Sequence, residues 1–342
     1  MTGALTWARL SYRQQKWELL LVAVGALAAA AAMVWFATTL DAMRAANPDC
    51  LAGIGGGFVG AEQEPGAACQ GVTSRYFETE SFASTLLYLS WAAPFGMGVI
   101  LGAPLVAREL DGGTAQLAWS LSRSRIGWLL RRIAFIAVFG LALLVVLAVT
   151  SELLAAAIFP DRPLGEDFTW YGRRGPLVVA RGVGAIAIGV LVGAIIGRVL
   201  PAVLASIIVI GVIFAGVSLG LDQWNRTEAT IERRNLEAFP PSGDELTALG
   251  VAYGIELVDG EFLSYSDAFD RGIEPNYSGV GGKVFESEAD IEAGTFIGYD
   301  AFLIIPGSRY TQLVARDSAV VVLVGAVALG MAGTVVRRRR PG

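Results

Sequence analysis

Residues 133–159 read IAFIAVFGLALLVVLAVTSELLAAAIF, and this stretch decides the class of fold. Its one ionisable side chain is Glu152. An α-helix rises about 1.5 Å per residue, so about 20 apolar residues cross the ~30 Å hydrocarbon core of a bilayer. We therefore predict a membrane-spanning helix over 133–151 that continues past Glu152 to Phe159.

Five further stretches share this length and apolar character, and the composition of the whole chain agrees with them. Of its 342 residues, 54% are hydrophobic and 17% are charged, whereas soluble domains are roughly 45–50% apolar. The additional spans are 19–40, 82–107, 175–197, which contains Arg181, 199–221 and 318–336. The sequence thus predicts an all-α polytopic membrane protein with six transmembrane helices.

Basic residues divide unevenly between the two sides of the predicted bundle. Six spans place both termini on one side together with 108–132 and Arg198, and that side carries 13 Lys and Arg in 50 residues. The opposite side carries 12 in 152 residues. Because positive residues near span ends favour the cytoplasm, we expect both termini there, with a basic tail at the end of 318–342.

Residues 1–18 precede the first span and admit two interpretations. Arg9, Arg13 and Lys16 recur along one face of a helix, which predicts an interfacial cytoplasmic helix along the inner leaflet. A positive flank that only sets the topology is the equally open alternative. Residues 19–221 then hold helices one to five, with an external loop at 41–81.

The longest predicted external segment, 222–317, lies between helices five and six and changes composition. It contains 18 Asp and Glu against 7 Lys and Arg, a net charge of −11. Hydrophobic alternation over 255–258 and 262–265 around an Asp-Gly turn predicts a β-hairpin, and 227–237 has a helical pattern. We expect an extracellular α+β insertion, whose acidity either keeps it soluble or recruits a cationic substrate.

Both cysteines, Cys50 and Cys69, fall in the external loop 41–81. Exposure to oxidising conditions predicts a disulfide between them, and closing so short a loop stabilises the fold by about 3 kcal/mol on the chain-entropy model. Two free thiols are the alternative.

The chain lacks residues that several enzyme classes require. It has no histidine, which excludes Ser-His-Asp and Cys-His nucleophile pairs and imidazole-ligated metal sites. A phosphate-binding loop ending at Gly282-Lys283 would need glycine at 277 and Ser or Thr at 284, but the chain has Tyr277 and Val284. We predict no catalytic residue, metal or cofactor in this chain.

Two kinds of residue stand out inside the predicted spans. Glu152 and Arg181 fall at similar depth in antiparallel neighbours, which predicts an ion pair. A charged spot lining an export path and snorkelling of Arg181 to the interface are the alternatives. Gly189, Gly193 and Gly197 recur every four residues and predict a helix-packing face, within one subunit or between two.

Residues 108–125 lie between the second and third spans and have a distinct pattern. The pair Gly112-Gly113 permits a sharp turn, and Thr114 can cap a short helix whose apolar side chains lie outside the bilayer. Ser124 can cap the helix that enters the third span. Exposed apolar surface at this place requires a partner.

This segment resembles the corresponding segment of ABC transporter permeases of the type-2 exporter class, especially the actinobacterial kind. The resemblance rests on Ala107-Arg108-Glu109, Gly113-Thr114, and Leu121-Ser122-Arg123-Ser124-Arg125 leading into Trp128. Two other stretches agree with it: 181–201, with Gly197-Arg198 and Leu200-Pro201, and Pro306-Gly307-Ser308-Arg309-Tyr310 with Gln312. The likeness covers the six-span framework and does not extend to 222–290.

The resemblance implies a function and a set of partners. The chain would be a permease subunit in the plasma membrane of a bacterium, paired with a second permease subunit, identical or different, in contact with membrane lipid and without nucleic acid. Two ABC ATPase subunits, which bind ATP and Mg, would grip a coupling helix in 108–125. The residues assigned to this coupling are Arg108, Glu109, Asp111, Gly113, Thr114, Leu117, Trp119, Leu121, Arg123 and Arg125. A non-transporting sensor or scaffold that presents the acidic domain is the alternative function.

Overall fold

The structure is a computed structural model, and it describes residues 2–51, 69–115, 119, 124–233, 247–271, 276–277, 283–285 and 296–339. Within these residues six helices are long and apolar enough to cross a membrane. They are Gln15–Ala46, Gln70–Asp111, Arg125–Ile158, Pro176–Ile196, Val199–Glu228 and Gly307–Arg338. The prediction of a six-span helical protein is confirmed.

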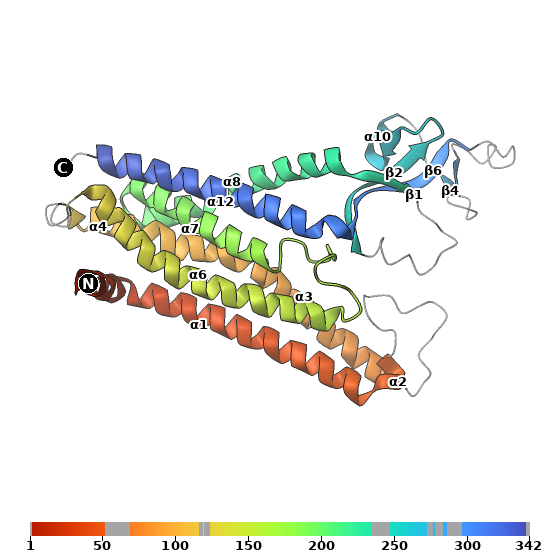
Figure 1. The fold of residues 1–342 in the computed structure, drawn as a ribbon, viewed down its shortest axis with the longest axis horizontal. Coiled ribbons are helices and arrows are strands. Elements are labelled where there is room, and N and C mark those ends of the chain that lie inside the picture. The colour runs from red at the N-terminus through yellow and green to blue at the C-terminus, as the bar shows by residue number, and fades with distance from the viewer. Residues whose placement is uncertain are drawn as a thin grey trace.

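The long helices lie side by side in one bundle (Figure 1). Helix α1 (Thr2–Ala46) begins and α12 (Tyr310–Arg338) ends at the same end of this bundle, which we call the termini end. A small β-sheet lies beyond the opposite end, the sheet end. In α1, Gln15 has non-helical backbone angles and separates the first residues from the span. Placement of 1–18 along the membrane surface stays a prediction.

Helix α7 (Pro176–Ile196) lies at the centre of the bundle. It contacts α3 (Gln70–Met97), α6 (Arg125–Ile158), α8 (Val199–Glu228) and α12, and most of its residues are buried. Helices α1 and α8, in contrast, expose many large apolar side chains. This difference fits helices at the edge of a bundle in lipid, where the exposed apolar surface faces acyl chains.

The second span is interrupted by a π-helical turn. This turn, η1 (Gly98–Gly102), joins α3 to α4 (Ala103–Asp111). Pro104 has no N–H to donate to the preceding turn, and a locally widened turn accommodates that loss. The π turn thus lies directly before Pro104, while Pro94 lies inside α3.

Glycines on both sides let η1 and α7 approach closely. A Cβ built at Gly98 would lie 2.5 Å from the carbonyl carbon of Ala185, and one at Gly102 would lie 2.5 Å from the carbonyl oxygen of Ile186. On α7, a Cβ at Gly189 would lie 2.3 Å from the carbonyl oxygen of Gly98. Backbones meet here at a distance that only glycine allows.

The predicted glycine stripe of the fourth span has two different roles. Gly189 and Gly193 face the second span of the same chain, and a Cβ at Gly193 would lie 2.2 Å from the carbonyl oxygen of Ala103. Gly197 instead ends α7 in a left-handed conformation with φ +70, and its N–H donates to the carbonyl of Gly193 at 3.0 Å. This is a helix C-cap that favours glycine for its positive φ.

The sheet contains six antiparallel strands among the described residues. The order is β3 (Phe262–Ser264), β2 (Leu249–Leu257), β6 (Gly298–Ile305), β5 (Lys283–Phe285) and β4 (Asn276–Tyr277), while β1 (Thr230–Arg233) also pairs with β6. The predicted hairpin is confirmed, since Gly254 pairs with Ser264 and Glu256 with Phe262.

The predicted helix over 227–237 is wrong over 229–233, since α8 ends at Glu228, while 234–237 lie outside the described residues. Thr230 to Arg233 pair with Ile304 to Ala301 of β6 instead. Thr230 and Ile231 are β-branched and suit an extended strand, and the open edge of β6 supplies the hydrogen bonds.

A hydrophobic cluster joins the loop after α6 and the base of the sheet to α7 and α12. Its buried residues include Phe168, Leu177, Ile305, Tyr310 and Leu313.

A disulfide lies at the same end of the bundle. It joins Cys50 and Cys69, whose Cα atoms are 5.2 Å apart. The predicted disulfide is confirmed, and it links the short helix α2 (Pro48–Leu51) to the start of α3.

The close approach of α7 to η1 makes a quantitative prediction. Replacing Gly189 with Ala should lower the free energy of unfolding by about 1–3 kcal/mol, because the new methyl group would collide with backbone. The matched control is Gly330→Ala in α12, where a new Cβ meets nothing within 4 Å. Thermal unfolding of the purified variants in detergent measures both. Equal midpoints for the two variants would contradict the packing described.

Candidate functional site

The turn after α4 is fixed by a buried ion pair. Glu109 and Arg132 are both 4% exposed, and the Arg132 guanidinium pairs with Glu109 Oε1. The Thr114 hydroxyl donates to Glu109 Oε2 at 2.7 Å. Gly112 follows the last turn of α4, and Gly113 takes φ +66, which reverses the chain. One carboxylate thus holds both α6 and the turn that follows α4.

Two neighbouring residues of α4 reach other helices. Arg108 forms an ion pair with Glu18 of α1. Asp111 Oδ2 accepts a hydrogen bond of 3.3 Å from the N–H of Val199, the first residue of α8. The end of α4 is therefore bonded to the termini ends of α1, α6 and α8.

The chain re-enters the bundle through Ser124 and Arg125. Ser124 caps α6 by accepting a hydrogen bond of 3.0 Å from the N–H of Gly127. The Arg125 guanidinium lies 4.6 Å from the Trp119 ring, and its Nη1 donates to the carbonyl of Arg339 at 2.5 Å. Leu117, Leu121 and Arg123 lie outside the described residues. Residues 116–118, whose N–H groups Thr114 would cap, also lie outside the described residues.

The predicted ion pair between Glu152 and Arg181 is corrected by the structure. Glu152 Oε2 lies 2.6 Å from Arg174 Nη1, and Arg174 is 1% exposed. Arg181 donates to the backbone carbonyl of Gly172. Arg174 directly precedes the apolar stretch 175–197 in the sequence, and Gly175, at φ +65, folds the loop back over the bundle. The half-buried Glu152 carboxylate thus pairs with a buried guanidinium that comes from the loop.

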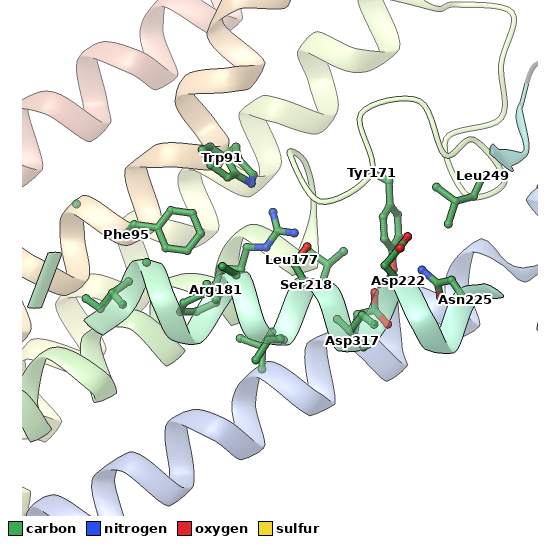
Figure 2. Close-up of a pocket in the computed structure, with 18 of the residues that line it drawn as sticks. Trp91, Phe95, Tyr171, Leu177, Arg181, Ser218, Asp222, Asn225, Leu249 and Asp317 are labelled. Carbon is green, nitrogen blue, oxygen red and sulfur yellow. Dashed lines mark hydrogen bonds between the residues drawn. The ribbon is translucent and has the colours of Figure 1, made fainter. Parts of the chain in front are cut away.

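A cavity of about 820 Å³ lies in the sheet-end half of the bundle, between α3, α7, α8 and α12 (Figure 2). Its walls are mainly apolar, with polar groups from Tyr171, Arg181, Ser218, Asn225 and Asp317. The first residues of β2 border it, so the sheet contributes to its wall. The sequence offered a path-lining charge at Arg181 as one alternative, but it did not indicate the rest of this cavity, since the lining comes from elements far apart in the chain.

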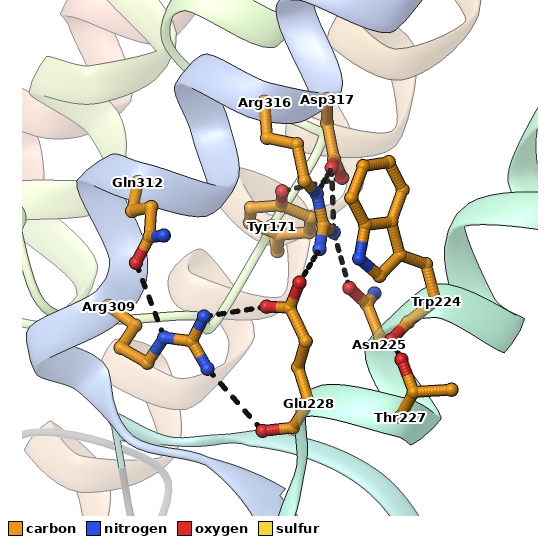
Figure 3. A network of polar contacts seen from close by, with 9 residues as sticks. All are labelled: Tyr171, Trp224, Asn225, Thr227, Glu228, Arg309, Gln312, Arg316 and Asp317. Carbon is orange, nitrogen blue, oxygen red and sulfur yellow. Dashed lines mark hydrogen bonds and ion pairs between the residues drawn. The ribbon is translucent and has the colours of Figure 1, made fainter.

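A polar network closes the sheet end between α8 and α12 (Figure 3). Glu228 lies 2.6 Å from Arg309 Nη2 and 3.3 Å from Arg316 Nη1. Arg316 also pairs with Asp317 at 2.9 Å, and Asp317 accepts a 2.7 Å hydrogen bond from the Tyr171 hydroxyl. Burial and the adjacent Asp317 carboxylate raise the pKa of Tyr171, so that its hydroxyl stays protonated as the donor.

Comparison with known proteins gives one match. The model of a family described as ABC-2 membrane transporter related matches residues 20–222. No curated protein and no solved structure matches the chain. The match covers the first five spans and the turn after α4, and ends before the sheet.

The corrected ion pair can be tested with a double-mutant cycle. Glu152→Ala and Arg174→Ala should couple by about 1–3 kcal/mol, because removal of Glu152 leaves the buried Arg174 guanidinium without its anionic partner. Glu152→Ala and Arg181→Ala should add within about 0.5 kcal/mol. Unfolding of the purified variants in a titration with sodium dodecyl sulfate measures both cycles. Stronger coupling to Arg181 than to Arg174 would refute the assignment.

Proposed function

The chain belongs to the ABC-2 membrane transporter related family, and from this membership we propose that it is the transmembrane permease subunit of an ATP-driven exporter. Two copies, or this chain and a related one, would form the export pathway. Two separate ATPase subunits, which bind ATP and Mg, would supply the energy. The observation that carries the proposal is the anchoring of the turn after α4 to three other helices.

This anchoring suits transmission of force from a partner. A helix seated in a groove of another protein moves with that protein as a rigid body. A displacement of 112–125 would act on α6 through Glu109, on α1 through Arg108 and on α8 through Asp111. Two of these contacts are ion pairs and the third is a hydrogen bond, so the bundle would move with the segment. We therefore assign 108–125 as the coupling segment.

Charge supports an orientation with the termini end in the cytoplasm. The basic tail reaches into the bundle there, because Arg339 Nη1 donates to the carbonyl of Ala194 near the end of α7 at 2.6 Å. The disulfide and the described residues of the acidic segment 222–317 lie at the sheet end. Disulfides persist on the oxidising side of the membrane and basic residues are retained on the cytoplasmic side. The sheet would thus face outward.

The coupling proposal predicts a selective loss of the ATPase subunit. Leu117→Glu should abolish co-purification of an ATPase and the associated ATP hydrolysis, because a charge would enter an apolar contact. The control is Phe269→Glu in α10 (Tyr265–Asp270) at the sheet end, where Phe269 is 62% exposed. Affinity purification from membranes of the native host, mass spectrometry and ATPase assays measure the outcome. A wild-type chain that purifies without any ATPase would favour the sensor or scaffold function.

The orientation predicts which end a membrane-impermeant thiol reagent can reach. Ser266→Cys in α10 should be labelled in intact cells, whereas Arg338→Cys at the end of α12 should react only after lysis. Both native cysteines are in the disulfide, so the background is low. Labelling of Arg338→Cys from outside would reverse the topology.

A further inference from the structure

The cavity combines an apolar interior with one partly buried cation. Trp91, Phe95 and Phe214 form a chain of edge-to-face contacts along its wall, with ring centroids 5.4 and 4.9 Å apart. Arg181 extends from α7 into the same space (Figure 2). Of the residues that the structure describes, no carboxylate lies within ion-pair distance of its guanidinium; its one hydrogen bond there goes to the Gly172 carbonyl.

Each of the two carboxylates that line the cavity forms an ion pair with another arginine. Asp317 is 4% exposed, and its two oxygens accept from Arg316 Nε and the Tyr171 hydroxyl. Asp222 lies 3.3 Å from Arg226. Arg181 is thus a cation that faces an apolar space. A charged side chain in a membrane span is costly in free energy, so its presence indicates a ligand or a pathway.

We propose that this cavity binds an amphiphile with an apolar chain and a single anionic head group, a carboxylate or a phosphate, which Arg181 recognises. Its identification as the exported substrate rests on the proposed exporter function, whereas the binding itself does not. Guanidinium groups form two parallel hydrogen bonds with carboxylates and phosphates, and this geometry suits such a head group. The aromatic wall would hold the chain.

The head group, and not the chain, must provide the selectivity. An apolar chain gains little by moving from lipid into an apolar cavity, because acyl chains are as apolar as the cavity wall. A single anion, in contrast, meets a desolvated cation whose electrostatic attraction is weakly screened. The cavity should therefore discriminate between an acid and an alcohol of equal chain length. The first residues of β2 border the cavity at the sheet end, and a head group could leave the membrane at that place.

The test measures binding of palmitate and of hexadecanol to the full-length protein in a neutral detergent by native mass spectrometry. We expect palmitate to bind more tightly than hexadecanol, and Arg181→Gln to weaken palmitate binding roughly tenfold while leaving hexadecanol unchanged. Arg181→Lys should retain most of the affinity for palmitate. Inorganic phosphate at the same concentration should not displace palmitate, since it lacks the chain.

A second pair of variants leaves Arg181 in place, in case its replacement prevents folding. Gly211 and Gly216 are both exposed on α8, and a new Cβ at either meets nothing within 4 Å. Gly211 lines the cavity and Gly216 does not. Gly211→Phe should therefore reduce palmitate binding, and Gly216→Phe should not.

Three results would overturn the proposal: equal binding of palmitate and hexadecanol, unchanged palmitate binding in Arg181→Gln, or equal effects of the two phenylalanine variants. These results are separable from failure of the exporter function. If the chain selects palmitate but purifies without an ATPase, the binding site is supported and the exporter function is refuted. If it purifies with an ATPase but does not distinguish palmitate from hexadecanol, the exporter function is supported and the binding site is refuted.

Discussion

The close approach of α7 to the second span is the contact on which the rest of the structure depends. Helices in lipid gain no hydrophobic energy by associating, so they rely on packing at short range and on polar contacts. Glycine at 98, 102, 189 and 193 supplies that packing, because at each position a side chain would collide with backbone of the facing helix. The other spans are arranged around this pair, and α7 contacts three of them, α6, α8 and α12.

Charged residues supply the second kind of contact, and they concentrate at the two ends of the bundle. At the termini end, Glu109 and Arg132 are buried together and fix the turn after α4. At the sheet end, Arg316 joins Glu228 to Asp317 and so connects α8 to α12. Each pair is shielded from water, where removal of one partner costs far more than it does at a surface. The bundle is therefore held at both ends by electrostatics and in the middle by close packing.

The sequence was informative wherever a local pattern determines the structure. Six apolar stretches predicted the spans, an Asp-Gly turn predicted the hairpin of β2 and β3, and two cysteines in one loop predicted the disulfide. Contacts that depend on the folding of a loop were missed. Arg174 lies outside the spans in the sequence, and only the turn at Gly175 brings it to Glu152. The cavity was missed for the same reason, because its polar groups come from a loop and three helices.

The π turn η1 connects the two candidate sites. Val99 and Ile100 line the cavity, while Gly98 and Gly102 on the same turn contact α7. The helix then continues without a break from η1 through α4 to Glu109 at the turn. A π turn inside an α-helix is rare and frequently lies at a functional site. Force applied at the turn after α4 would therefore reach the cavity wall along one helix, and the π turn on that route lies at the wall itself.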